Sequence, residues 1–179
     1  MGTVNERWRP NVTVAAVVER GGRYLLVEEA SPRGPLLNNP AGHLDPGETL
    51  LRAVVREVLE ETARVFTPTH LQGIHLAPSA SDDGVTYLRF AFTGSVGEPI
   101  LGRALDDGIL RTLWLTAEEI AAERPRHRSA LLMRCIDDHR AVRRVAGTRN
   151  GQARAVDVGV VAEHGDRHRG ALGGGHAVG

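Results

Sequence analysis

The segment from Gly42 to Glu61 concentrates acidic side chains at a spacing that brings them onto one face of a helix. It has the sequence GHLDPGETLLRAVVREVLEE. Glu57, Glu60 and Glu61 stand at positions i, i+3 and i+4, so a helix places their carboxylates within about 100° of one another. Because like charges at this spacing destabilise a helix by about 0.2–0.5 kcal/mol per pair, a positive charge is expected among them. Hard oxygen ligands of this kind suit Mg²⁺ or Mn²⁺.

Arg56 and the loop before the helix fit the same chemistry. Arg56 can pair with Glu60 one turn further on, or reach back to Glu48, and so orient the carboxylates around a metal ion. Gly42 lets the backbone of the loop approach a ligand closely. For residues 56–61 taken alone, an ordinary solvated helix face with exchangeable ion pairs is an equally simple interpretation. The full spacing fixes six residue types over twenty positions and is far more restrictive.

The elements that must position this segment alternate between strands and helices. Residues 50–62 have the periodicity of an amphipathic helix. Further helices are expected at residues 117–123, capped by Thr116, and 129–142, and strands at residues 12–18, 24–27, 71–76, 86–93 and 110–115. The stretch 38–47, rich in Asn, Pro and Gly, is expected to be a shaped loop. This order predicts an α/β or α+β domain with a mixed sheet.

Composition excludes several kinds of chemistry. The chain has 22 basic residues against 22 acidic ones, and every basic residue is an arginine. A chain without lysine cannot form a Schiff base or supply the lysine of a Walker-type phosphate loop, whereas arginine can still bind phosphate. Zero net charge argues against a nucleic-acid partner. No run reaches the roughly 18 apolar residues of a membrane span, and the single Cys135 fits a buried side chain in a reducing compartment. We therefore expect a soluble, cytoplasmic protein with no membrane partner.

The composition of the chain changes near residue 145. Residues 1–10 are interpreted as an N-terminal arm and residues 11–145 as one domain. Residues 146–179 hold nine of the 21 glycines and have little apolar periodicity, which predicts a disordered tail. The apolar stretch 86–93 fits either the core or a homodimer interface, and the sequence leaves both open.

The acidic segment resembles the Nudix box, the signature of hydrolases that act on nucleoside diphosphates linked to another moiety. That signature is Gly, five residues, Glu, seven residues, and then Arg-Glu-apolar-any-Glu-Glu-any-Gly-apolar. All its acidic positions are present here, while Ala63 and Arg64 stand at its last two positions. Alanine costs little at Ala63 unless the helix end requires a left-handed residue. The resemblance extends over residues 11–142 to the NudJ-type phosphatases of that family, through NVTVAAVVER, LLVEE, NNPAGHLDPGETL, YLRF, LDDGILRTLWL and RSALLMRCIDD.

The resemblance implies a Nudix α-β-α sandwich with a mixed β-sheet, and it assigns roles to residues. The implied metal ligands are Glu57, Glu60, Glu61 and the Gly42 carbonyl, and the implied catalytic set is Glu57, Glu60, Arg56 and Glu48. In the family the general base is sometimes a helix glutamate and sometimes an acid on a later loop. For the latter role Asp107 and Asp106 are the first candidates, followed by Asp83 and Asp82. Arg89 and Tyr87 are candidate substrate contacts, with a structural ion pair and core packing as their respective alternatives.

The implied activity is Mg²⁺- or Mn²⁺-dependent release of phosphate from a small-molecule substrate. The substrates would be nucleoside tri- or diphosphates, or thiamine-pathway pyrophosphates such as hydroxymethylpyrimidine pyrophosphate. One alternative is a Nudix pyrophosphatase acting on ADP-ribose or another nucleoside diphosphate linked to a second group. Another is a Nudix-fold binding or regulatory module without catalysis, although such modules usually lose box glutamates. A third alternative is an unrelated α/β domain whose helix has an acidic face.

Overall fold

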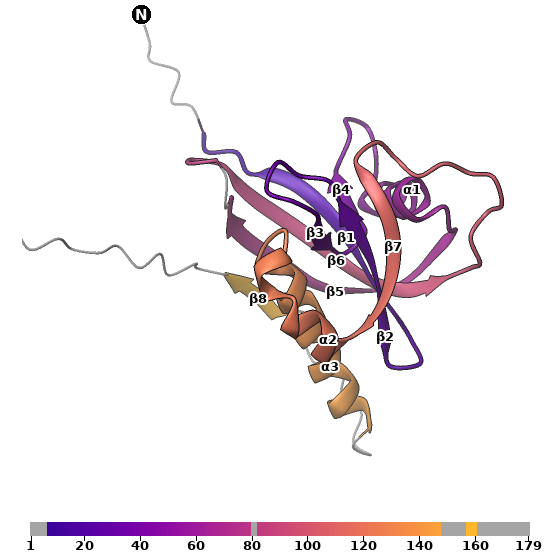
Figure 1. Cartoon of the computed structure of the whole chain (residues 1–179). Coiled ribbons are helices and arrows are strands. Elements are labelled where there is room, and N and C mark those ends of the chain that lie inside the picture. The colour runs from indigo at the N-terminus through magenta and orange to yellow at the C-terminus, as the bar shows by residue number, and fades with distance from the viewer. Residues whose placement is uncertain (1–6, 80–81, 148–156, 161–179) are drawn as a thin grey trace, which may run out of the picture.

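The computed structural model describes residues 7–79, 82–147 and 157–160 and is built around an eight-stranded sheet (Figure 1). The strands are β1 (Asn11–Arg20), β2 (Arg23–Glu29), β3 (Leu36–Asn38), β4 (Ala41–His43), β5 (Phe66–Pro78), β6 (Thr86–Val96), β7 (Ile109–Thr116) and β8 (Asp157–Val160). The helices are α1 (Leu50–Thr62), α2 (Ala117–Ala122), the 3₁₀ turn η1 (Arg124–Arg126) and α3 (Leu131–Gly147). The strand order is β3-β2-β1-β6-β5-β8, with β4 paired to β1 and β7 paired to β2.

The sheet contains both parallel and antiparallel strand pairs, which confirms the prediction of a mixed sheet. Strand β1 runs parallel to β6 and antiparallel to β2 and β4. The β1–β2 hairpin turns at Gly21 and Gly22, whose φ angles of 60° and 82° are left-handed values that glycine adopts without strain.

Apolar cores on both faces of the sheet make the domain a three-layer sandwich, as expected. Alternate β1 residues, including Val14 and Val18, pack against Val54 and Val58 of α1. Val17 of β1 belongs to a second core on the other face of the sheet. Helices α2 and α3 cover this core with Ala117, Ile120, Leu132, Cys135 and Ile136. Figure 1 shows α1 on one side of the sheet and α2 with α3 on the other. The continuous apolar run of β1 is explained because both its faces are buried.

Several of the expected elements differ in extent from the structure. Strands β5 and β6 are longer than predicted, since they pair along nearly their whole length. Strand β6 lies between β1 and β5, and its residues Ala91 and Phe92 are buried, so the stretch 86–93 is core in this chain. The expectation of a loop throughout residues 38–47 is wrong, because β3 ends at Asn38 and β4 occupies Ala41–His43. Pairing with β2 and β1 overrides the local turn composition there.

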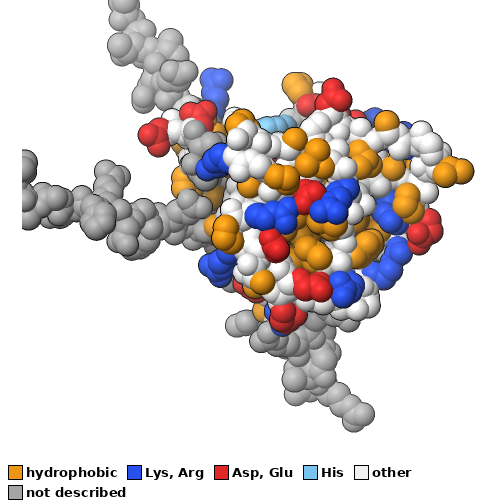
Figure 2. Space-filling view, in the orientation of Figure 1, with side chains coloured by type: hydrophobic (Ala, Val, Ile, Leu, Met, Phe, Trp, Pro, Cys, Tyr) orange, Lys and Arg blue, Asp and Glu red, His pale blue; other side chains and the backbone are white. Residues whose placement is uncertain are grey.

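The segment predicted as a tail is only partly described. Helix α3 continues to Gly147, and β8 pairs in parallel with β5. The remaining tail residues and residues 1–6 of the N-terminal arm lie outside the described residues, so the predicted domain boundaries stay predictions. Within the described ranges, no helix is both long and apolar enough to cross a membrane. On the face shown in Figure 2, arginine and acidic side chains are interspersed.

Candidate active site

Helix α1 begins and ends in a way that fixes the acidic face against β4. Thr49 caps its N-terminus, with Oγ1 accepting a hydrogen bond from the Arg52 amide at 3.3 Å. Ala63 caps the C-terminus at φ 53° and ψ 26°, a left-handed conformation. It is the only non-glycine residue with positive φ in the described chain. This is the position at which the Nudix box has glycine. The helix end requires a left-handed residue here, so alanine is less favourable than glycine.

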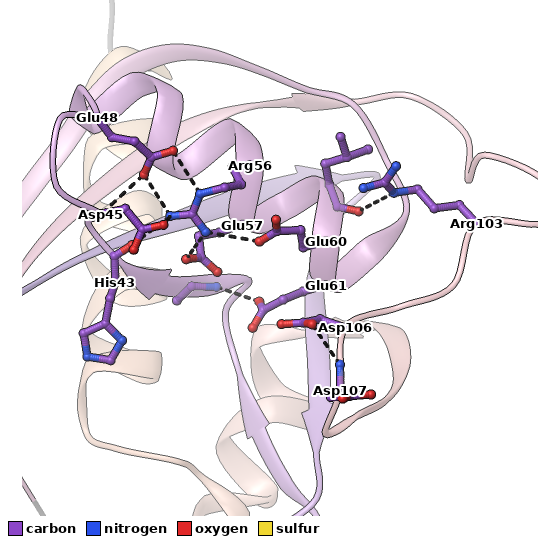
Figure 3. Close-up of polar contacts among 12 residues, drawn as sticks. His43, Asp45, Glu48, Arg56, Glu57, Glu60, Glu61, Arg103, Asp106 and Asp107 are labelled. Atoms are coloured by element: carbon purple, nitrogen blue, oxygen red, sulfur yellow. Dashed lines mark hydrogen bonds and ion pairs between the residues drawn. The ribbon is translucent and has the colours of Figure 1, made fainter.

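Arg56 is the positive charge expected among the helix carboxylates (Figure 3). Its Nε and Nη2 donate to the two oxygens of Glu48, both at 2.9 Å. Its Nη1 donates to Glu57 at 2.8 Å and to Glu60 at 3.1 Å, and its Nη2 also donates to the His43 carbonyl at 3.0 Å. The bonds from Arg56 lower the pKa of Glu48. Arg56 therefore orients three carboxylates and ties them to β4.

Gly42 makes room for the Glu57 carboxylate. A Cβ built on Gly42 would lie 2.1 Å from the Glu57 carboxyl carbon and from Oε2. Only a residue without a side chain fits there, as expected for a close backbone approach. Glu57 is buried, and this burial raises its pKa in spite of the bond from Arg56.

Glu61 is the most deeply buried of the three helix glutamates. Its Oε2 accepts a hydrogen bond from the Ala41 amide at 2.8 Å. Burial raises its pKa to about 8, and the negative charges of Glu29, Glu57 and Asp106 act in the same direction. Within the described part of the chain no arginine forms an ion pair with Glu61. This corner of the site therefore crowds acidic groups together, and a cation bound there would favour their charged forms.

The loop before β7 brings two more acids to the same place. The Asp106 amide donates to the Glu60 carbonyl at the end of α1, at 2.9 Å, and Ile100 donates to the Ala63 carbonyl at 2.8 Å. The Asp107 amide donates to Oδ1 of Asp106 at 2.9 Å. Figure 3 shows Asp106 next to Glu61. The free carbonyls at the helix end thus position the loop that carries both candidate bases.

A cavity of about 350 Å³ opens beside these acids. One group of its lining side chains is acidic and another is basic. The acids are Glu29, Glu61, Asp106 and Asp107, and the bases are Arg33, Arg89 and Arg128. Gly42, Tyr87 and His43 also line it, and the His43 and Tyr87 rings lie 6.1 Å apart. Such a cavity can hold a phosphate chain between cation-binding carboxylates and arginines.

The structure brings together most of the residues singled out from the sequence. Gly42, Glu61, Asp106, Asp107, Arg89 and Tyr87 all line the cavity, and Arg56 joins Glu48, Glu57 and Glu60 beside it. Sequence reasoning missed Glu29, Arg33 and Arg128, which come from the end of β2, the β2–β3 loop and the segment before α3. Glu29 accepts a hydrogen bond from Asn38 at 2.9 Å and pairs with Arg128 at 3.6 Å. No local pattern marks these residues, because only the tertiary fold makes them neighbours.

The residues beside the cavity fit a hard divalent cation by their chemistry. Glu57, Glu60 and Glu61 offer carboxylate oxygens from successive turns of one helix, and such oxygens are the ligands that Mg²⁺ and Mn²⁺ prefer. In the described ranges, however, no three His, Cys, Asp or Glu side chains are already grouped as metal ligands. Arg56 occupies the position between Glu57 and Glu60. Binding of a cation therefore requires these side chains to adjust.

Comparison with known proteins decides the family. Residues 7–134 match the NUDIX domain. The chain belongs to the Nudix family. It is 39% identical over 115 residues to phosphatase NudJ of Escherichia coli K12, a match that covers 63% of this chain and 72% of that protein. A solved Nudix hydrolase from Nitrosomonas europaea is 50% identical, with a TM-score of 0.70, over 74% of this chain and 90% of that one.

A more distant structure shares the fold alone. The NUDIX domain of Shewanella oneidensis NrtR, solved in complex with ADP ribose, is 18% identical and has a TM-score of 0.56 over 74% of this chain and 88% of that one. The family and the 39% identity to a phosphatase identify this Nudix protein as a hydrolase of substrates that contain a pyrophosphate group.

Proposed function

We propose that this Nudix hydrolase is a Mg²⁺- or Mn²⁺-dependent phosphatase of small pyrophosphates. Its substrates would be nucleoside tri- or diphosphates, or a thiamine-pathway pyrophosphate such as hydroxymethylpyrimidine pyrophosphate. The observation that carries the proposal is a single cavity lined both by acids from α1 and the loop before β7 and by arginines. The 39% identity to a NudJ phosphatase supports phosphate release as the reaction.

In the proposed site the glutamates of α1 hold the cation. Glu57, Glu60 and Glu61 would supply carboxylate oxygens, and the Gly42 carbonyl a further ligand. When bound, the cation neutralises charge on the phosphate oxygens and lowers the pKa of water. Arg56 and Glu48 act on the ligands rather than on the substrate, since their hydrogen bonds fix the positions of Glu57 and Glu60.

We propose that Asp107 or Asp106 accepts the proton from the attacking water. Both line the cavity, whereas Glu57 and Glu60 do not. The backbone bond from Asp106 to Glu60 holds this loop beside the glutamates. A carboxylate at the cavity wall is within reach of a water in the cavity, as a general base requires.

The size of the cavity favours a small substrate. Its volume of about 350 Å³ is near the lower end of the range of about 300–1,000 Å³ for small-molecule sites. A pyrimidine pyrophosphate needs less space than ADP-ribose, which carries two ribose rings and an adenine. His43 and Tyr87 provide ring faces at the cavity wall for a planar heterocycle.

A phosphate-release screen tests the proposal. The purified protein is incubated with nucleoside triphosphates, nucleoside diphosphates, hydroxymethylpyrimidine pyrophosphate and ADP-ribose, each with Mg²⁺, with Mn²⁺ and with EDTA. Metal-dependent orthophosphate release from the pyrophosphate supports the proposal. Nucleoside monophosphate from ADP-ribose without orthophosphate release would establish the pyrophosphatase alternative. Absence of turnover on every substrate would favour a binding or regulatory module.

A further inference from the structure

Arg89 and Thr13 form a buried part of the cavity wall, its floor. Two nitrogens of Arg89 have no hydrogen-bond partner there among the described residues. Arg89 is a β6 residue, paired in register with Thr13 of β1 on one side and His75 of β5 on the other. Arg89 is 8% exposed, and its Nε and Nη1 are buried and make no hydrogen bond to any described residue. Oγ1 of Thr13 is likewise buried without a hydrogen bond to any described residue, and Thr13 is 4% exposed. Both residues line the cavity.

A buried guanidinium in this state is costly to the folded protein. A charge removed from water needs both a counter-charge and hydrogen bonds. In the described residues no ion pair involves Arg89, and the acids whose charges act on it, Glu29 and Glu61, have partners of their own. Glu29 is bonded to Asn38 and pairs with Arg128, while Glu61 accepts the Ala41 amide. Burial accordingly lowers the pKa of Arg89.

The free groups specify the chemistry of the missing partner. Nε and Nη1 of Arg89 can only donate hydrogen bonds, and the Thr13 hydroxyl can donate a third. A ligand that satisfies them must be an acceptor with several oxygens and a negative charge. A phosphate group meets both conditions and matches the planar guanidinium fork.

Arg89 and Thr13 reach the cavity from the face of the sheet opposite α1. In β1, Val14 packs in the core under α1, so its neighbour Thr13 faces the opposite side of the sheet, as does its register partner Arg89. The glutamates come from α1, on the other side of that sheet; Glu61 also lines the cavity, whereas Glu57 and Glu60 do not. An anion on the floor would find free donors of the protein itself in Arg89 and Thr13, so its binding would not depend on a bridging cation.

We infer that Arg89 and Thr13 form a metal-independent binding site for a phosphate-type oxyanion on the floor of the cavity. The inference rests on the proposed function, because it places a phosphoryl group of the substrate, or the orthophosphate product, in the same cavity. The enzyme then binds its ligand in two ways, through a cation held by carboxylates and through hydrogen bonds from Arg89. We therefore expect the enzyme to prefer substrates with a phosphate group that can reach Arg89.

Thermal unfolding in EDTA with increasing inorganic phosphate tests the site without requiring turnover. The midpoint Tm of the wild type should rise with the logarithm of phosphate concentration. The Arg89→Met variant should have a Tm equal to or above that of the wild type without phosphate, because an unpaired buried charge has been removed. Its phosphate affinity should fall about 10- to 100-fold. Thr13→Val keeps the charge and should weaken binding less.

Arg140→Met is the matched control. Arg140 forms an exposed ion pair with Glu118 at 2.9 Å and is not a cavity residue, so its response to phosphate should equal that of the wild type. An equal phosphate response in Arg89→Met would overturn the inference. So would a large loss of stability in that variant, since Arg89 would then be a structural residue. A wild type that does not respond to phosphate would also overturn it.

Steady-state kinetics with Mg²⁺ separates the two sources of the oxyanion. If the floor binds a substrate phosphate, Arg89→Met raises KM by about 10- to 100-fold with little change in kcat. If it binds the product, KM is unchanged and inhibition by added orthophosphate is lost. Because the EDTA experiment needs no catalysis, a failed substrate screen and a failed oxyanion site give different results.

Discussion

Replacing Gly42 with alanine should remove activity while leaving the fold intact. The new Cβ would lie 2.1 Å from the Glu57 carboxylate, whereas ordinary contact begins at 3.4 Å. The carboxylate must therefore retreat by about 1.3 Å, the difference between these two distances. A displacement of about 1 Å in a catalytic group can cost about 100-fold in rate. We expect kcat for metal-dependent phosphate release to fall by about that factor.

The stability of Gly42→Ala should stay close to that of the wild type. The obstructing atoms belong to the end of a flexible side chain, which can rotate away. Loss of the Glu57–Arg56 bond, about 1 kcal/mol, is offset by the gain of about 0.4–1 kcal/mol from reduced freedom of the unfolded chain. The free energy of unfolding, measured by urea titration, should therefore change by less than about 1 kcal/mol.

Two other glycines serve as controls for the steric argument. A Cβ at Gly97 would meet nothing within 4 Å, so Gly97→Ala should alter neither kcat nor stability. A Cβ at Gly94 would lie 2.2 Å from the Thr67 carbonyl oxygen, which is backbone and cannot move aside. Gly94→Ala should therefore destabilise the protein by about 1–3 kcal/mol. A Gly42→Ala enzyme with wild-type kcat would refute the reasoning, because the position of Glu57 would then not matter for catalysis.

Three further predictions concern the glutamates and the helix end. Glu60→Gln should reduce metal-dependent kcat by about 100-fold or more with unchanged Tm; wild-type turnover would contradict a role in holding the cation. Glu28 accepts bonds from Arg111 and Arg126, which lower its pKa below the ordinary 4.5. Its contribution to stability is therefore present above pH 4.5 and lost as the pH falls through the lowered pKa. Glu28→Gln should be less stable than the wild type by about 1–2 kcal/mol at pH 7, a difference that urea titrations should show shrinking in acid; a difference independent of pH would contradict it. Ala63→Val should cost about 2 kcal/mol or more because a branched side chain resists positive φ, whereas Ala63→Gly should stay within about 1 kcal/mol; equal stability of the two variants would contradict the left-handed cap.

The part of the site that lies within one short segment could be predicted from the sequence. The spacing of Glu57, Glu60 and Glu61 fixes their helix face, because 3.6 residues per turn applies wherever the segment is helical. The same geometry placed Arg56 among them, and the structure confirms its pairs with Glu60 and Glu48. The amphipathic pattern of residues 50–62 likewise predicted the bounds of α1.

Features that depend on distant parts of the chain could not be predicted. Strand β4 exists because Ala41 and Gly42 pair with β1, although Asn, Pro and Gly around them favour a turn. Glu29 and Arg128 are neighbours only because β2 and the segment before α3 meet at the cavity. The lack of hydrogen-bond partners for Arg89 was equally inaccessible, since a sequence does not show which donors remain free after folding.

The two ends of α1 explain why the glutamates and the candidate bases lie together. The helix face supplies Glu57 and Glu61, and its last carbonyls receive the amides of the loop that carries Asp106. Ala63 adopts a left-handed conformation, and its carbonyl accepts the Ile100 amide. The left-handed turn at this residue, which costs about 1–2 kcal/mol, thus holds one part of the loop that carries Asp106. Because both acids and arginines line one cavity, a chain with zero net charge still offers a phosphate two different means of binding.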